Sequence, residues 1–138
     1  MNPSIILKTV ARWAASSMFL FSLFLYYRGH NAPGGGFIAG LMACGGMVLV
    51  LYAYGKKELQ RWLVFSPASW VIVGLSCAYL SALWGLVISG SFFKGIWIQV
   101  PLLEKIGTPM LFDFGVMAVV IGMFTKILLA VGVKGEKQ

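Results

Sequence analysis

The chain has 138 residues, of which 59% are hydrophobic and only 11% are charged, and its mean hydropathy is +0.87. These values differ strongly from those of soluble domains. The formal charge of +7 is dispersed over the chain instead of forming a basic stripe with aromatic stacking platforms. The composition therefore indicates an integral membrane protein and argues against a nucleic-acid-binding protein.

Four apolar stretches are long enough to cross a hydrocarbon core of about 30 Å as helices. They lie at about residues 4–27, 37–54, 68–90 and 111–133. The first also resembles a signal peptide, with basic residues ahead of an apolar run, but YYRGH follows it where a small-residue cleavage site would be needed. We therefore expect an all-α membrane protein that forms a single domain over residues 1–138, with four transmembrane helices.

The positive charges are divided unequally between the two ends of these helices. Seven of them fall on one side of the membrane and three fall on the other. The positive-inside rule places the richer side in the cytoplasm, so both termini are expected there. The seven are Lys8, Arg12, Lys56, Lys57, Arg61, Lys134 and Lys137, and the three are Arg28, Lys94 and Lys105.

A polar segment, RGHNAPGGGF at residues 28–37, separates the first two predicted helices. Gly34, Gly36 and Gly40 form the pattern GxGxxxG, which differs from the GxGxxG of dinucleotide-binding folds, and no predicted strand precedes it. The pattern therefore argues against nucleotide binding. The segment contains the only histidine, His30, for which two interpretations stay open: a proton-relay group near the external surface, or a hydrogen-bonded loop residue.

Two of the predicted helices have faces of small residues spaced four apart. Gly36, Gly40 and Cys44 share one face of the second helix, and Gly74 and Ala78 begin a similar face on the third. Small residues allow helices to approach closely in a bilayer. We expect these faces to contact packing partners, within the chain or in another subunit.

The segment SFFKGIWIQVPLLEKIGTPM, residues 91–110, joins the third and fourth predicted helices on the external side. It mixes aromatic and aliphatic residues with two prolines. This composition favours a segment that lies at the membrane interface, with Phe92 and Trp97 as its anchors.

Two ionisable residues lie in the fourth predicted helix. Asp113 and Lys126 are thirteen residues apart, about 20 Å along the helix axis, so they cannot pair with each other. Lys126 either extends to the membrane surface, or faces a polar cavity, or meets a carboxylate from another subunit. Asp113 either stabilises the N-terminus of its helix or takes part in an ion route. The sequence shows no recognisable catalytic set and no cluster of metal ligands, so we expect no enzyme activity, no cofactor and no metal.

Two segments resemble a known family. GHNAPGGGFIAGL at 29–41 and GTPMLFDFGVMAVVIG at 107–122 are similar to segments of the MnhB-domain family, the B-type subunits of the multisubunit Mrp-type Na+/H+ antiporters, and the similarity covers nearly the whole chain. The resemblance implies an accessory subunit of an assembly of about seven different proteins in the bacterial cell membrane, which exports Na+ in exchange for protons. The motif positions are His30, Asn31, Pro33, Gly34, Gly35, Gly36, Phe37 and Gly40 in the first segment, and Thr108, Pro109, Phe112, Asp113 and Gly115 in the second.

The resemblance leaves three functional hypotheses open. In the first, the chain packs against larger subunits through its small-residue faces and lines part of an ion or proton route with His30, Asp113 and Lys126. In the second, it is a purely structural scaffold of that complex, or of a related membrane-bound hydrogenase or complex I-like assembly. In the third, it is an autonomous channel formed by a homo-oligomer. We expect other subunits, Na+, H+ and membrane lipid as partners, and no nucleic acid.

Overall fold

The computed structural model describes residues 4–29, 33–91, 95–100 and 103–134. Some of the residues singled out above fall outside these ranges, and the predictions made for them stay predictions. They are His30, Asn31, Phe92, Lys94 and Lys137.

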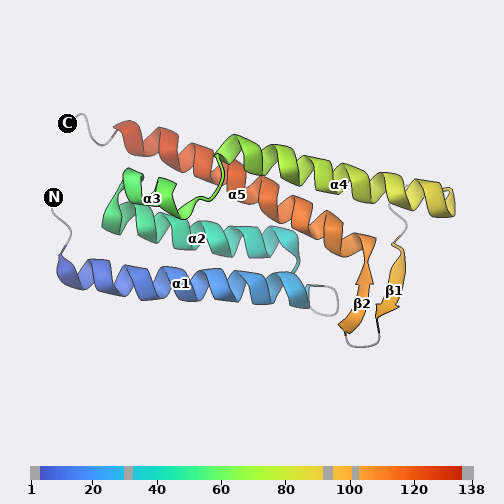
Figure 1. Cartoon of the computed structure of the whole chain (residues 1–138). Helices are drawn as coiled ribbons and strands as arrows, with labels where there is room; N and C mark the ends of the chain where they lie inside the picture. The colour runs from blue at the N-terminus through green and yellow to red at the C-terminus, as the bar shows by residue number, and fades with distance from the viewer. Residues whose placement is uncertain (1–3, 30–32, 92–94, 101–102, 135–138) are drawn as a thin grey trace.

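Four long helices form most of the described chain (Figure 1). They are α1 (Ile5–Arg28), α2 (Gly36–Tyr54), α4 (Pro67–Ser89) and α5 (Thr108–Lys134). The four predicted helices are therefore present, and α5 begins three residues earlier than the sequence predicts. Pro109 lies in the first turn of α5, where its missing N–H removes no helical hydrogen bond.

The helices do not follow one another in space in chain order. α1 packs against α2, α2 packs against α5, and α5 packs against α4, so the spatial order is α1, α2, α5, α4 (Figure 1). The start of α1 and the end of α5 lie at one end of the molecule, which we call the terminal end. The starts of α2 and α5 lie toward the other end, which we call the motif end.

The segment between α2 and α4 contains a short helix that the sequence analysis treats as a loop. This helix, α3 (Lys56–Trp62), follows Gly55, whose φ of +83° favours glycine. Leu59 of α3 is fully buried in the core, and the ring of Trp62 lies 5.7 Å from that of Phe19 in α1. Burial of Leu59 therefore fixes α3 against the terminal end of the long helices.

The segment between α4 and α5 also contains secondary structure that the sequence did not predict. It contains an antiparallel hairpin of β1 (Trp97–Val100) and β2 (Leu103–Gly107), with Trp97 opposite Gly107. Pairing the two strands satisfies backbone groups that would be costly to leave bare near a membrane. The prediction of a helical protein is thus correct for its body, and this small sheet is an addition to it.

Three stretches of the described chain are long and apolar enough to cross a membrane: Gly36–Tyr54, Lys56–Ile88 and Thr108–Val131. α1 is not among them, although its 24 residues give it sufficient length. Its sequence contains Lys8, Arg12 and several hydroxyl residues, which make it less apolar than the other three. The structure therefore supports three spans by composition and does not establish a fourth.

The predicted small-residue faces are used inside the chain. A Cβ atom at Gly40 of α2 would lie 2.9 Å from Val120 of α5, and one at Gly74 of α4 would lie 2.6 Å from the carbonyl oxygen of Gly115. The small-residue faces of α2 and α4 thus both pack against α5. The sequence left open whether these faces pack within the chain or against another subunit, and at these two contacts they pack within the chain, because α5 fills the space that glycine leaves.

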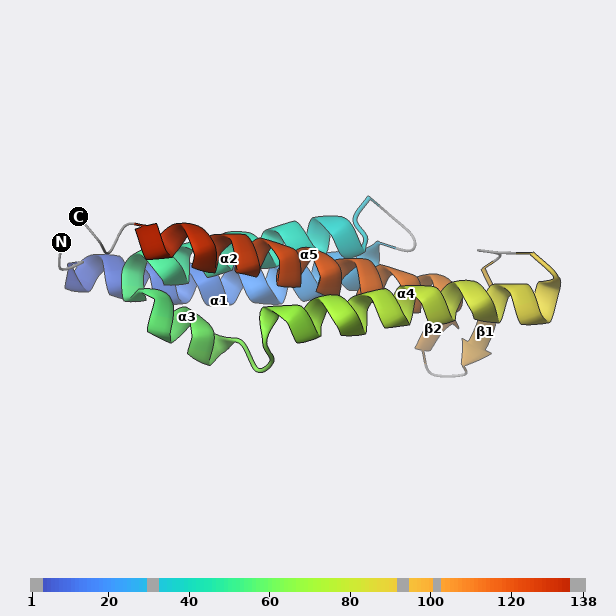
Figure 2. The ribbon, with the colours of Figure 1, turned by 90° about the horizontal axis from the view of Figure 1, so that it is seen from above.

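α4 is displaced along its axis relative to the other long helices. Ser81 lies beside Thr108, the first residue of α5, since its hydroxyl donates to the Thr108 carbonyl at 2.6 Å. At the other end of the contact, a Cβ at Gly122 would lie 2.7 Å from the carbonyl oxygen of Pro67, the first residue of α4. The last two turns of α4 therefore project about 12 Å beyond the start of α5, and α5 continues about 18 Å beyond the start of α4 (Figures 1 and 2).

Candidate functional site

The two sequence motifs meet at the motif end of the molecule. A Cβ atom at Gly36, the first residue of α2, would overlap the carbonyl oxygen of Asp113 in α5. A Cβ at Gly35 would lie 3.4 Å from the Asp113 carboxylate oxygen Oδ2. The backbone at the start of α2 therefore touches α5 at Asp113, and this contact is the centre of the candidate site, which we call the motif junction.

The consecutive glycines allow the chain to turn tightly between α1 and α2. The N–H of Gly35 donates to the carbonyl of Leu25 at 3.3 Å, and the φ of Gly35 is +103°. A Cβ at Gly34 would lie 2.8 Å from the same carbonyl oxygen, and one at Gly29 would overlap the nitrogen of Gly35. Backbone thus packs on backbone here, which only residues without a side chain permit.

Tyr26 connects α1 to α5 at the same junction. Its hydroxyl donates to the carbonyl of Met110 at 3.0 Å, and its ring meets that of Phe114 edge to face, with centroids 6.3 Å apart. Tyr26 was not predicted from the sequence as a site residue. Its position three residues before the segment GHNAPGGGFIAGL was the available signal, but nothing in the sequence showed that its hydroxyl reaches another helix.

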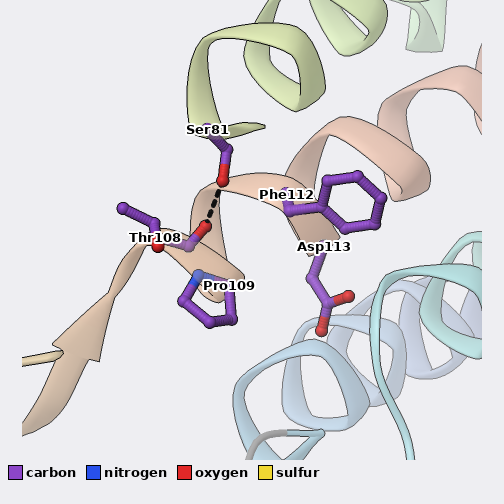
Figure 3. Close-up of a pocket in the computed structure, with 5 residues that line it drawn as sticks. All are labelled: Ser81, Thr108, Pro109, Phe112 and Asp113. Carbon is purple, nitrogen blue, oxygen red and sulfur yellow. Dashed lines mark hydrogen bonds between the residues drawn. The ribbon is translucent and has the colours of Figure 1, made fainter. Parts of the chain in front are cut away.

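A cavity of about 250 Å³ lies beside the junction, at the start of α5 (Figure 3). Figure 3 shows the carboxylate of Asp113 on the side of α5 that faces α1 and α2, whereas Ser81 and Thr108 lie toward α4. The hydroxyl of Thr108 accepts a hydrogen bond from the N–H of Ile96 at 3.1 Å, so the hairpin is fixed to this edge of the cavity. The lining residues are Ser81, Thr108, Pro109, Phe112 and Asp113.

The structure places the predicted site residues at different locations. Asp113 is half-buried at the junction, and Thr108, Pro109 and Phe112 surround the cavity beside it. Lys126 is exposed, thirteen residues further along α5 and about 20 Å away, so the structure does not bring it to the junction.

The other motif residues divide between packing and exposure. Gly115 is buried, and a Cβ there would lie 2.8 Å from the backbone nitrogen of Ala78 in α4. Pro33 and Phe37 are exposed. Most of the motif glycines therefore serve close packing of the backbone.

The chemistry at the junction is that of one carboxylate with neighbouring hydroxyl and backbone groups. Within the described ranges, no three His, Cys, Asp or Glu residues are grouped so that they could hold a metal ion. A half-buried carboxylate can accept and release a proton, and it can attract a hydrated cation. Proton or cation handling is thus the chemistry available to Asp113 here.

Comparison with known proteins gives a consistent family. The family model described as "Domain related to MnhB subunit of Na+/H+ antiporter" matches residues 6–126. The B-type Na(+)/H(+) antiporter subunit of Bacillus subtilis (strain 168) is 35% identical over 135 residues, which is 93% of this chain and 92% of the relative.

Two further matches are parts of much longer chains. The probable K(+)/H(+) antiporter A/B subunit of Rhizobium meliloti (strain 1021) is 30% identical over 131 residues, covering 88% of this chain but 12% of that protein. A chain in the structure of the Mrp complex from Dietzia sp. DQ12-45-1b superposes with a TM-score of 0.82 at 27% identity, covering 93% of this chain and 14% of that chain.

Proposed function

This chain belongs to the family of domains related to the MnhB subunit of Na+/H+ antiporters, and on that basis we propose that it is an accessory membrane subunit of a multisubunit antiporter. The complex would export Na+ in exchange for protons. The observation that carries this proposal is the family match over most of the chain, joined to the structural similarity with a chain of the Mrp complex. The family is one of transporters, so we propose no catalytic centre.

We propose that α1 spans the membrane with the other three long helices, as a single integral domain in the bacterial cell membrane. Exposed hydroxyls on α1 support this, because they are satisfied inside the helix: Thr9 donates to the carbonyl of Ile5 at 3.0 Å, and Ser17 to that of Trp13 at 2.9 Å. A lipid-facing helix needs such internal bonds. The terminal end would face the cytoplasm, where the guanidinium of Arg12 lies over the ring of Tyr54.

We propose a large subunit of the A type as the principal neighbour in the complex. The support is that the Rhizobium relative is named as a combined A/B protein, and this chain corresponds to 12% of it. Segments joined in one polypeptide in one organism are good candidates for neighbours when they are separate chains in another. The whole assembly would contain about seven different subunits, by resemblance to Mrp-type antiporters.

At the motif junction, we propose that Asp113 borders the route of the transported protons or Na+. Its half-burial and the adjacent cavity support this role. His30, in the first motif segment, stays a second candidate by sequence. The alternative is a purely structural scaffold, in this complex or in a related hydrogenase or complex I-like assembly, and the tight glycine contacts at Gly35 and Gly36 are what favour it.

Replacement of Asp113 distinguishes these two roles. Asp113→Asn keeps the shape of the side chain but cannot exchange a proton, and Glu58→Gln at the terminal end is the matched control. Co-purification of the other subunits and Na+-driven ΔpH in membrane vesicles are measured for both variants. A route residue predicts an assembled complex with transport lowered at least about tenfold, whereas normal transport by Asp113→Asn would exclude Asp113 from the route.

A further inference from the structure

The second half of α5 has an exposed face and extends beyond the start of α4. Because α4 begins opposite Gly122, residues beyond this point have no α4 beside them. Met123, Ile127 and Val131 recur every four residues and are 50%, 55% and 65% exposed. Lys126 is exposed between them. We call the surface formed by Met123, Lys126, Ile127, Ala130 and Val131 the α5 face.

Lys126 lies well inside the length of the neighbouring helix. The hydroxyl of Thr125, its chain neighbour, contacts the sulfur of Met47 in α2 at 3.1 Å. α2 continues for seven more residues, to Tyr54, which is about 10 Å toward the terminal end. The charge on Lys126 therefore sits at a depth where hydrocarbon is an unfavourable surrounding.

The carboxylates in the described part of the chain do not balance this charge. Glu58 pairs with Arg61 at 3.2 Å. Asp113 is about 20 Å from Lys126 along the same helix. β2, which contains Glu104, is joined to the opposite end of α5.

We propose that the α5 face binds a transmembrane helix of a partner subunit, and that this helix presents an Asp or Glu side chain to Lys126. Intramembrane cations are normally paired, and the charge of Lys126 specifies an acidic partner. Ala130, one turn from Lys126 on the same face, has a small side chain that allows a second helix to approach closely. This proposal rests on the proposed role within a complex and adds the surface and its chemistry.

The outer face of α4 is apolar like the α5 face but carries no charge. Its exposed residues include Ile72, Val73, Leu75 and Val87, and α4 has no charged residue between Pro67 and Ser89. The hydroxyl of Ser76 donates to the carbonyl of Ile72 at 2.8 Å, inside its own helix. That face is suited to lipid, so it provides a control surface of similar exposure.

Photocrosslinking in the assembled complex tests the position of the partner helix. A photoreactive amino acid is introduced at Ile127, or at Ile72 as the matched control, and the complex is irradiated in native membranes. We expect an adduct with a specific partner subunit from Ile127 and lipid adducts from Ile72. Lipid adducts alone from both positions, in a complex that still co-purifies its subunits, would overturn the α5 face as an interface.

Substitution of Lys126 tests the charge. Lys126→Gln is expected to lower the amount of co-purified partner roughly tenfold, the size of one lost ion pair, and Lys126→Glu should lower it further, while Lys126→Arg retains it. Reversal of the crosslinked partner's acidic residue to Lys should restore binding to Lys126→Glu. If Lys126→Gln and Lys126→Glu both co-purify as much partner as the wild-type chain, Lys126 only extends to lipid headgroups. A wild-type chain that co-purifies with no other membrane protein would instead refute the proposed function itself.

Discussion

The two halves of α5 are surrounded in different ways. Its first half, around Asp113 and Gly115, touches the backbones of α2 and α4 and the side chain of Tyr26 in α1. Its second half, beyond Gly122, has no α4 beside it and exposes Met123 and other large apolar side chains. The first half is packed to the limit that glycine allows, and the second half is open on one side.

This difference shows what the two motifs specify. In a bilayer, burial of apolar surface contributes little to helix association. Close backbone contacts therefore have to stabilise the association of the helices. The motif glycines described above lie where such contacts occur, and the open half of α5 carries none of them. The motif junction thus stabilises the packing of the helices, while the open half of α5 is available to bind a helix of a partner subunit.

The largest effect is expected from Gly36→Ala, which tests the packing limit of the first half. The new methyl group would overlap the carbonyl oxygen of Asp113, so α2 and α5 have to separate. We expect a loss of about 3 kcal/mol, measured as a lower melting temperature of the purified protein. Gly45→Ala is the control, since its methyl group would meet only the flexible end of Met18 at 2.5 Å. Equal effects of the two changes would contradict the account.

Gly115→Ala tests the contact of the first half with α4. Its methyl group would lie 2.6 Å from the carbonyl oxygen of Gly74 and 2.8 Å from the nitrogen of Ala78. These contacts are less severe than the overlap at Gly36, so a loss of about 2 kcal/mol is expected. Distances between spin labels on α4 and α5 should increase in parallel. Unchanged distances with unchanged stability would show that the two helices are less closely packed than described.

A smaller effect is expected from Tyr26→Phe, which removes one hydrogen bond between α1 and the first half of α5. The carbonyl of Met110 loses its side-chain donor, while the ring contact with Phe114 is kept. The expected cost is about 1 kcal/mol, seen as a modest shift in melting temperature. Tyr27→Phe serves as the comparison, because Tyr27 is 51% exposed. If the Tyr26 variant is as stable as the Tyr27 variant, the hydrogen bond of Tyr26 does not stabilise the junction.

The smallest effect on the isolated protein is expected from Ile127→Ala in the open half. Ile127 is 55% exposed, so its truncation should change the free energy of unfolding by less than about 0.5 kcal/mol. The same change should weaken co-purification of the partner subunits, because it shortens a side chain on the α5 face. A strongly destabilised protein would mean that the open half is packed more tightly than the structure shows.

The helices were predictable from the sequence because a long apolar stretch leaves a membrane chain few alternatives. All four predicted helices begin and end within three residues of the observed bounds. The separation of Asp113 from Lys126 also followed from helical rise alone. The prediction that α1 spans the membrane was supported by its length but not by its composition, since Lys8, Arg12 and its hydroxyl residues lower its apolar character.

The long-range features could not be predicted from one sequence. Spacing showed that Gly36 and Gly74 belong to small-residue faces, but not that both faces meet α5. The meeting of the two motifs at Asp113 and the axial displacement of α4 depend on contacts between distant segments. The β1–β2 hairpin was missed because its apolar residues were interpreted as interface anchors, and α3 because seven residues give too little periodicity.

The proposed role as an antiporter subunit is tested by Na+-driven ΔpH in membrane vesicles from cells that lack this chain and from cells in which it is restored. An accessory subunit predicts no antiport without the chain, full antiport when it is restored, and co-purification of the chain with the other subunits. The isolated chain, reconstituted alone, should conduct no ions. Normal antiport without the chain, or ion transport by the chain alone, would contradict its assignment as an accessory component of the antiporter.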